Sequence, residues 1–451
     1  MKQKNRVYTL KITSVTPEGD GISRTEDGKV VFTPRCCEDD VINVKIIKET
    51  TGYLVGKAEE ILTPSAHRIT PDCPVFNQCG GCALRHMNYE AEKALKYNHV
   101  CDCLARIGKC DIKPEYIVSP VTQRYRNKAQ YPLTEKDGKI SAGYFARHSH
   151  RVIPHGDCLL QPEKTTDIIK DTLNMLNGFS VYESETGKGL LRHIYLRRNR
   201  EGDYCVMPVI NGRNTADFLP IAQKLVSLHP EIKSFYVNIN TENTNVILGK
   251  ECVLLLGSEY LTDVLCKKKF LVSPLSFWQV NPDAAEALLY KAKEYAALKS
   301  SDIVCDLYCG TGSVGICCSD TDNKLFGIEI IPQAVEDAKR NAAANGYSDF
   351  RFVCADSEKG MEECVKTFGT PDVVFTDPPR KGMTEKVISD IAASGTKKVV
   401  YISCNPSTLA RDIKIFAEKG YTVQNAAVFD LFPRTSHVES VVCLTRSDKA
   451  T

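Results

Sequence analysis

The fold of the C-terminal part of this chain is decided by residues 302–315, which read Asp-Ile-Val-Cys-Asp-Leu-Tyr-Cys-Gly-Thr-Gly-Ser-Val-Gly. An apolar run followed by a glycine-rich turn and a helix start allows close backbone approach at the carboxyl end of a strand, where open α/β sheets bind ligands. A second apolar run, residues 325–328, ends at Glu329, whose carboxylate can accept hydrogen bonds from both ribose hydroxyls. The pattern predicts a doubly wound α/β domain with a nucleotide pocket.

A third apolar run leads into a rigid turn. Residues 372–380 read Asp-Val-Val-Phe-Thr-Asp-Pro-Pro-Arg, and a strand that ends in Asp-Pro-Pro is an active-site turn found in many methyltransferases. The glycines and Glu329 would also fit a dinucleotide-binding domain, whereas the Asp-Pro-Pro turn argues against one. The plain alternative is a surface turn.

Residues 400–406, Val-Tyr-Ile-Ser-Cys-Asn-Pro, place Cys404 at the end of an apolar run and before an expected helix. Asn405 and Pro406 suit the cap and first turn of that helix. The partial positive charge of a helix N-terminus favours thiolate over thiol, which makes Cys404 a candidate nucleophile. With 20 cysteines in the chain, the alternative is a small buried hydrophobe.

Four ordered motifs resemble the S-adenosylmethionine-dependent RNA 5-methyluridine (uracil-C5) methyltransferases, which act on ribosomal or transfer RNA. They are Asp-Leu-Tyr-Cys-Gly-Thr-Gly at 306–312, Asp-Pro-Pro-Arg at 377–380, Ser-Cys-Asn-Pro at 403–406 and His-Val-Glu at 437–439. The resemblance covers nearly the whole chain. It implies that Cys404 is the nucleophile and Glu439 the general base. It also implies that S-adenosyl-L-methionine and the target base are bound by Gln279, Tyr308, Gly310, Ser313, Glu329, Asp356 and Asp377.

The chemistry of uracil explains these roles. C5 is a poor nucleophile, so a thiolate first adds to C6 and makes an enolate whose C5 can accept the sulfonium methyl group. A base must then remove the C5 proton before the cysteine is eliminated. Without the motif, Glu439 would be read as a solvated surface charge.

A second constellation lies near the front of the chain and consists of Cys73, Cys79, Cys82 and the distant Cys158. Thiolates are the ligands of iron–sulfur clusters, and the glycines at 80 and 81 let the backbone fold around a bulky core. Zinc is the competing metal. Members of the resembled family carry a four-iron four-sulfur (4Fe-4S) cluster at matching cysteines, which implies a structural cluster here. Cys101 and Cys103 are a rival pair, but their spacing in a helical stretch points them to different faces.

Composition bounds the remaining questions. The chain has 451 residues, 43% hydrophobic and 25% charged, which predicts about three domains of an ordinary cytoplasmic protein. No apolar run approaches a membrane span and no secretory signal follows the basic N-terminus. We expect reduced thiols in the cytosol rather than a disulfide scaffold, and a monomer.

The domain prediction has three parts. Residues 1–62 alternate apolar and polar between Gly-Asp-Gly and Glu-Asp-Gly turns, which indicates a small β-barrel that resembles the OB-like, RNA-binding TRAM domain. Residues 63–274 are expected to form a central α+β domain that carries the cluster segment. Residues 275–451 are the Rossmann-like methyltransferase domain. The alternative for the barrel is a purely packing role.

Two basic stretches of the central domain are candidates for RNA contact. Seven Lys or Arg residues lie between Arg124 and Arg151, interleaved with Tyr125, Tyr131, Tyr144 and Phe145, a mixture that suits single-stranded RNA. Arg192, Arg197, Arg198 and Arg200 alternate with apolar residues as a half-exposed strand would. A partly buried sheet is the alternative for both.

The expected function is methylation of C5 of a uridine that is flipped out of structured RNA. The substrate is expected to be 23S ribosomal RNA, because a barrel together with a cluster resembles the ribosomal members of the family. Transfer RNA is the alternative substrate. An amino-group methyltransferase and an RNA-binding protein with an inactive catalytic domain are the rival classes, and the intact Cys404 and Glu439 argue against both.

Overall fold

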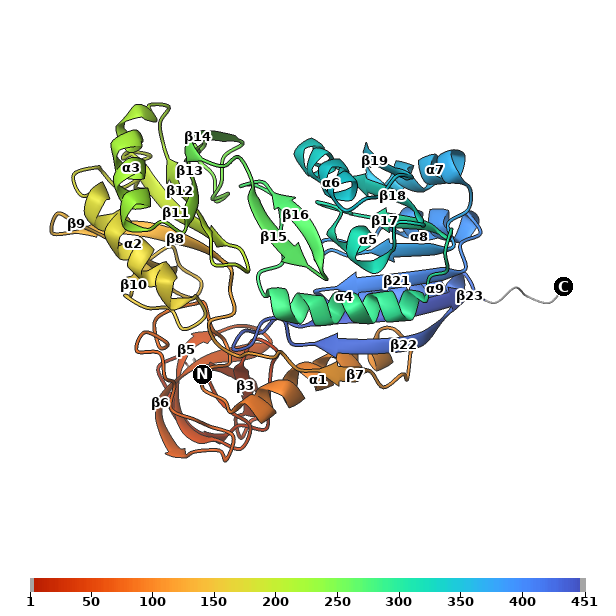
Figure 1. The fold of residues 1–451 in the computed structure, drawn as a ribbon. Coiled ribbons are helices and arrows are strands. Elements are labelled where there is room, and N and C mark those ends of the chain that lie inside the picture. Colours follow the sequence, from red (N-terminus) through yellow and green to blue (C-terminus); the bar gives the residue numbers. More distant parts are fainter. Residues whose placement is uncertain (1–3, 447–451) are drawn as a thin grey trace.

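The computed structural model describes residues 4–446 and divides them among three large sheets (Figure 1). The N-terminal sheet has the order β1-β5-β6-β4-β3-β2 and curls so that β1 also lies near β3. Its strands are β1 Val7–Lys11, β2 Ser14–Val15, β3 Asp20–Arg24, β4 Val30–Pro34, β5 Val41–Glu49 and β6 Tyr53–Thr63. Alternate residues of β5 are buried, because successive side chains of a strand point to opposite faces.

The central sheet has the order β10-β9-β8-β11-β12-β13-β14. Its strands are β8 Lys128–Lys136, β9 Lys139–Phe145, β10 Val152–Pro154, β11 Leu191–Arg198, β12 Tyr204–Ile210, β13 Ile232–Ile239 and β14 Glu251–Gly257. The helices α2 (Glu163–Leu176) and α3 (Leu219–Leu228), with the short helix η1 (Ala216–Phe218), pack against it. This is the expected α+β arrangement. A hairpin, β15 (Leu261–Leu265) with β16 (Lys268–Val272), leads into the last domain.

The C-terminal sheet has the order β19-β18-β17-β20-β21-β23-β22-β7. Its strands are β17 Ile303–Leu307, β18 Lys324–Glu329, β19 Phe350–Cys354, β20 Val373–Thr376, β21 Lys398–Ser403, β22 Tyr421–Phe429, β23 Glu439–Arg446 and β7 Glu115–Ile117. The helices are α4 Pro282–Ala296, α5 Ser313–Cys318, α6 Pro332–Ala344, α7 Ser357–Phe368, α8 Glu385–Ala393 and α9 Pro406–Glu418. Separate apolar cores lie on the two faces, which confirms the doubly wound fold.

The edge of this sheet comes from a distant part of the sequence. β7 pairs in parallel with β22, and α1 (Tyr89–Arg106) packs against α9. In Figure 1 both orange elements lie beside the blue C-terminal domain. Residues 89–117 therefore contact the C-terminal sheet, although the sequence boundary at 274 groups them with the central domain.

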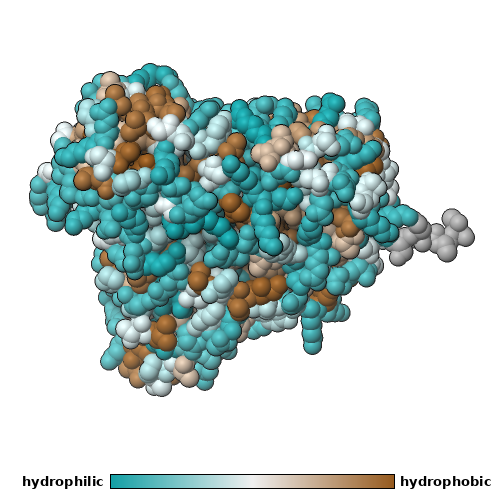
Figure 2. Space-filling view, viewed as in Figure 1, coloured by the Kyte–Doolittle hydropathy of each residue, from teal (hydrophilic) through white to brown (hydrophobic). Residues whose placement is uncertain are grey.

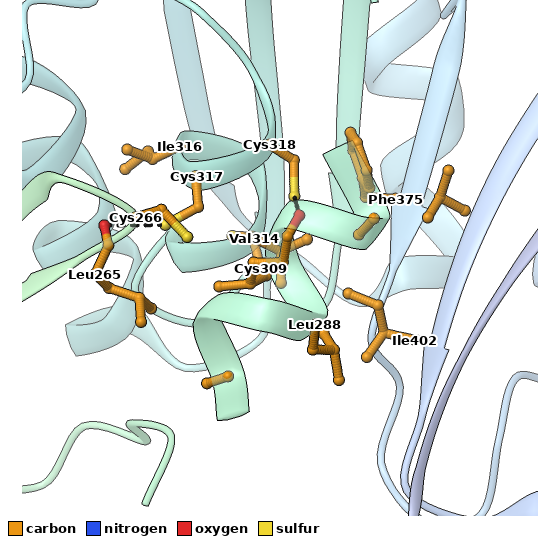
Figure 3. Close-up of a cluster of buried hydrophobic side chains, with 14 of the residues drawn as sticks. Leu265, Cys266, Leu288, Cys309, Val314, Ile316, Cys317, Cys318, Phe375 and Ile402 are labelled. Atoms are coloured by element: carbon orange, nitrogen blue, oxygen red, sulfur yellow. Dashed lines mark hydrogen bonds between the residues drawn. The ribbon is translucent and has the colours of Figure 1, made fainter. Parts of the chain in front are cut away.

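Many cysteines are ordinary core residues. Cys266, Cys309, Cys317 and Cys318 lie within one apolar cluster (Figure 3). Cys309 is only 2% exposed, which does not suit a nucleophile that must reach RNA. Among residues 4–446, no helix is both long and apolar enough to cross a membrane. The face shown in Figure 2 is mostly hydrophilic, with scattered hydrophobic spots.

Candidate active site

Two antiparallel strands bring Cys404 and Glu439 to the same edge of the sheet. Ser403 at the end of β21 pairs with Ser440 of β23. Because the two strands are antiparallel, Cys404, which follows Ser403, lies next to Glu439, which precedes Ser440. Asn405 caps α9 by accepting hydrogen bonds from the Ser407 and Thr408 N–H groups. Cys404 is half-buried and Glu439 is 7% exposed. The predicted nucleophile thus lies between β21 and the capped start of α9, and the predicted base begins β23.

The charges around Cys404 oppose ionisation of its thiol. Burial, Glu439 and Asp377 together raise the pKa of Cys404 to about 11, while Arg380 acts in the opposite direction. Burial and Asp377 also raise the pKa of Glu439 well above its usual range. The expectation that the helix N-terminus favours the thiolate is therefore wrong for the protein without substrate, because burial and two carboxyl groups outweigh the helix end.

The Asp-Pro-Pro-Arg turn after β20 brings Asp377 and Arg380 close to Cys404. Burial raises the pKa of Asp377 to about 7. The Arg380 guanidinium lies 3.2 Å from Nε2 and 3.3 Å from Nδ1 of His437. Burial and then Arg380 lower the pKa of His437 to about 4, so His437 is a neutral hydrogen-bonding partner. Asn405 ties this turn to α9, because its side-chain amide donates to the Arg380 carbonyl at 3.0 Å.

The glycine turn between β17 and α5 lies at the carboxyl ends of the parallel strands. Tyr308 and Gly310 both have left-handed backbone angles, with φ of 63° and 52°. A Cβ at Gly310 would meet no other atom within 4 Å, so the conformation and not crowding favours glycine there. The Glu329 carboxylate accepts hydrogen bonds from the N–H groups of Gly310 at 3.1 Å and Ile331 at 2.9 Å. Ser313 opens α5 at the same turn.

Two other predicted cofactor residues lie on separate segments. Asp356 is the exposed cap of α7 and accepts a hydrogen bond from the Glu358 N–H at 2.9 Å. Its neighbour Ser357 donates to the Tyr308 hydroxyl at 3.0 Å, which ties this cap to the glycine turn. Gln279 is half-buried, and its carbonyl accepts from the Asn127 amide of the central domain at 2.9 Å. The structure thus joins Asp356 to the pocket, but it links Gln279 to the central domain.

The four predicted cluster ligands line one cavity of about 90 Å³. Other residues that line it include Arg85, Arg126, Tyr144 and His155. The Gly81 N–H donates to Cys79 Sγ at 3.3 Å, and a Cβ at Gly80 would lie 3.0 Å from the Phe145 carbonyl and the Arg147 nitrogen. Burial raises the pKa of Cys82 to about 11, and Arg85 opposes this shift.

The cavity brings together the residues that the spacing predicted, and leaves out the rival pair. Cys101 and Cys103 lie on α1, outside the residues that line the cavity. Within residues 4–446, no group of three or more His, Cys, Asp or Glu side chains is arranged to hold a metal ion. The cavity is thus a cluster of thiols in the structure.

Two family models match parts of the chain: the tRNA (uracil-5-)-methyltransferase family over residues 244–447 and the TRAM domain over residues 2–58. A Clostridium tetani protein named as an uncharacterized RNA methyltransferase is 37% identical over 447 residues, 98% of this chain and 97% of the relative. A Halalkalibacterium halodurans protein named in the same way is 36% identical over 447 residues, with the same coverage. The chain belongs to the RNA uracil-5-methyltransferase family.

A solved structure agrees with the fold of this methyltransferase. The Pyrococcus abyssi tRNA (uracil-54, C5)-methyltransferase in complex with S-adenosyl-L-homocysteine matches with a TM-score of 0.77 and 23% identity, over 97% of this chain and 100% of that one. The expected arrangement of a TRAM domain and a Rossmann-like domain is confirmed. The protein is an S-adenosylmethionine-dependent RNA methyltransferase, as its motifs predicted.

The two basic stretches of this methyltransferase, which were candidates for RNA contact, include residues that are buried. Arg192 and Arg197 are buried and donate to backbone carbonyls, Arg192 to Asn240 and Arg197 to Ser273. The prediction of a half-exposed β11 was wrong, because this strand is central in its sheet and both faces are covered. Tyr125 and Tyr131 are also buried, and so their rings are not available for stacking on RNA bases.

Sequence reasoning missed the two arginines of the cysteine cavity. Arg85 lies three residues after Cys82, so its place beside the cysteines was visible as spacing. Arg126 is remote from the Cys73–Cys82 segment in sequence, and only the tertiary fold brings it to the cavity. Both arginines supply positive charge beside thiols, which favours bound thiolates over free thiols.

Proposed function

We propose that this protein transfers a methyl group to C5 of a uridine in RNA through a covalent bond between Cys404 and C6. The observation that carries the proposal is the pairing of Ser403 with Ser440, which sets the nucleophile and the base side by side. The glycine turn and Glu329 at the same edge would hold S-adenosylmethionine, which supplies the methyl group when bound. RNA is the substrate class of the family.

The residues act in a definite order. The Cys404 thiol gives its proton to water and its sulfur bonds to C6, which breaks the C5–C6 double bond and places an electron pair at C5. After C5 has gained the methyl group, Glu439 removes the remaining C5 proton. The C5–C6 double bond reforms and the Cys404 thiolate leaves. Because the pKa of Glu439 is raised, its carboxylate is a stronger base than an exposed glutamate.

The substrate is proposed to be 23S ribosomal RNA. The support is the combination of a TRAM domain with a four-cysteine cavity, the combination that resembles the ribosomal members. Transfer RNA remains the alternative, as named for the Pyrococcus abyssi protein. The test is mass mapping of both RNAs from cells that lack this protein. A missing 5-methyluridine in ribosomal RNA supports the proposal, and one missing from transfer RNA overturns the choice of substrate.

We also propose that Cys73, Cys79, Cys82 and Cys158 hold a structural 4Fe-4S cluster. The support is their shared cavity, an N–H group that donates to Cys79 Sγ, and the nearby arginines, which can balance an anionic cluster. Protein prepared without oxygen should be brown and contain iron and sulfide. Stoichiometric zinc without visible absorbance would overturn the assignment.

Three further properties follow as proposals. The protein acts as a monomer in the cytoplasm, where reduced thiols and RNA substrates are found. The domain limits in the sequence are 1–62, 63–274 and 275–451, with residues 89–117 packed against the sheet of the third domain. Analytical ultracentrifugation and limited proteolysis test the oligomeric state and the limits.

A further inference from the structure

The loop of residues 430–438 leads from β22 directly to Glu439 and has no helix or strand of its own. It includes His437, the partner of Arg380. The position of the base in β23 therefore depends on what holds this loop. Its contacts come largely from the segment that carries the cluster cysteines and from α1.

One backbone carbonyl joins the loop to the cysteine segment. The N–H groups of Ala83 and Leu84 both donate to the carbonyl of Arg434, at 3.0 and 3.1 Å. Ala83 directly follows Cys82, and Arg434 lies five residues before Glu439. Two hydrogen bonds and five residues of backbone thus connect the residues after Cys82 with Glu439.

Several contacts besides its carbonyl hold Arg434 in position. Its φ of 72° is left-handed, which a residue with a Cβ adopts only when its surroundings impose it. Its N–H donates to Glu92 Oε1 at 2.6 Å, and its guanidinium donates to the Met87 carbonyl at 3.2 Å. The side chain also lies over the ring of Tyr89.

A buried charge network on α1 fixes the first half of the loop. Lys96, which is 3% exposed, donates to Glu92 and Asp430 at 2.8 Å each and to the Phe432 carbonyl at 3.2 Å. Tyr89 donates to the other oxygen of Asp430 at 2.9 Å. Since buried ion pairs are costly to break, this network holds the loop in one conformation.

A second segment beside the cavity contacts the loop as well. The Tyr125 hydroxyl donates to the Pro433 carbonyl at 2.9 Å, and the next residue, Arg126, lines the cysteine cavity. Two segments next to the cavity therefore hold consecutive residues, Pro433 and Arg434. Cys404 is held differently, by the capped start of α9.

We propose that Arg434 is a positioning residue, and that the four-cysteine segment uses it to set Glu439 for removal of the C5 proton. This inference rests on the proposed function, because it assumes the cluster and the role of Glu439. The Arg434 carbonyl ties the 430–438 loop to Ala83 and Leu84, and its guanidinium ties the loop to the Met87 carbonyl and to Glu92. Loss of the guanidinium contacts loosens the loop and displaces the base, while Cys404 stays in place. Addition to C6 and methyl transfer then continue, and release of the methylated RNA becomes slow.

The test compares Arg434→Ala, the conservative Arg434→Lys, and Arg213→Ala as a matched control on an exposed arginine of the central domain. Each variant is assayed for turnover on uridine RNA and for covalent trapping by RNA that carries 5-fluorouridine. Arg434→Ala should lose about 10²-fold in turnover, accumulate methylated protein–RNA adduct, and keep its rate of trapping. Arg434→Lys should recover part of the loss, and Arg213→Ala should match the wild type.

Equal losses of turnover and trapping, or an unchanged turnover, would overturn the positioning role. If Arg434→Ala does not fold, amide hydrogen exchange of wild-type protein with and without iron gives the answer. Faster exchange in residues 430–438 after iron removal supports the link, and unchanged exchange there refutes it. Glu439→Gln separates the role of Glu439 as the base from the positioning role of Arg434. If Glu439→Gln accumulates adduct but Arg434→Ala does not, only the positioning role of Arg434 fails. If neither does, the proposed role of Glu439 fails.

Discussion

The cysteine cavity and the Cys404 site of this methyltransferase contain thiols with similar pKa values, but the charged groups beside those thiols differ. Burial raises the pKa of Cys82 in the cavity and of Cys404 at the sheet edge, each to about 11. Arg85 stands beside the first thiol, whereas the second has two carboxyl groups, Glu439 and Asp377, against one cation, Arg380. Neighbouring cations suit thiolates that stay ionised in a bound group. Neighbouring carboxyls suit a thiol that ionises only when substrate arrives, so the neighbours and not the pKa distinguish the roles.

The largest expected effect is at the sheet edge. Cys404→Ala should reduce methylation by about 10⁴-fold or more and abolish the covalent adduct, because no other group can add to C6. Iron content should stay at the wild-type value, since Cys404 is outside the cavity. Denaturing gels with 5-fluorouridine RNA and iron analysis measure both. An adduct in Cys404→Ala would move the nucleophile to another cysteine.

Glu439→Gln should act after methyl transfer. Removal of the base should lower turnover by about 10²–10⁴-fold, while a methylated adduct accumulates on ordinary uridine RNA. Mass spectrometry of the adduct shows whether the methyl group is present. Normal turnover would mean that another base takes the C5 proton.

At the cavity the expected effect is on stability rather than on chemistry. Cys73→Ala should lose iron and lower the free energy of unfolding by more than about 3 kcal/mol, because the cysteine segment closes around the bound group. Covalent trapping per folded molecule should persist. Chemical denaturation and iron analysis measure the change, and Cys101→Ala is the matched control. If Cys73→Ala loses its iron but keeps the stability of the wild type, the cavity has no structural role and the proposed difference between the two cysteine sites is wrong.

The cofactor pocket should respond more weakly than either cysteine site. Glu329→Ala should weaken S-adenosylmethionine binding by about 1–3 kcal/mol, since it removes the acceptor proposed for the ribose hydroxyls. Isothermal titration measures the affinity. Unchanged affinity would place Glu329 outside the site. Asp377→Ala should instead lower turnover at saturating cofactor.

The smallest expected effect is a pH dependence of stability from Asp377. Its pKa is raised to about 7 in the folded protein, so the folded state binds more protons than the unfolded state from about pH 4 to 7. The stabilisation is therefore complete below pH 4 and is lost as pH rises through 7. The full shift corresponds to about 4 kcal/mol, but Asp377 is partly exposed to solvent, so we expect only part of it. Between pH 4 and pH 8 the wild type should lose about 1 kcal/mol more stability than Asp377→Asn does. Chemical denaturation of both proteins at pH 4 and pH 8 measures this change. If the stability difference between the two proteins is the same at both pH values, the pKa of Asp377 is not raised.

Local signals explain which features were predictable. The glycine turn, the Asn405 cap and the Asp-Pro-Pro turn each depend on a few adjacent residues, and the structure contains the strands and helix starts they predicted. Spacing predicted Cys73, Cys79 and Cys82, and the family resemblance implied Cys158 as the fourth; all four line one cavity. The direction of the Cys404 pKa shift was not predicted, because it depends on burial in the folded protein and on Glu439 of another strand. The burial of Arg192 and Arg197 was missed because it depends on what covers both faces of β11.

The pairing of β7 with β22 has a consequence for how the chain reaches its native state. About three hundred residues separate the two strands, so the ribosome releases α1 and β7 long before their partners exist. Contacts of such long sequence separation form slowly and leave apolar surface open meanwhile. A fragment that begins at residue 275 would lack β7 altogether and carry β22 as an open edge, a known template for aggregation. The catalytic domain cannot be completed by its own stretch of sequence.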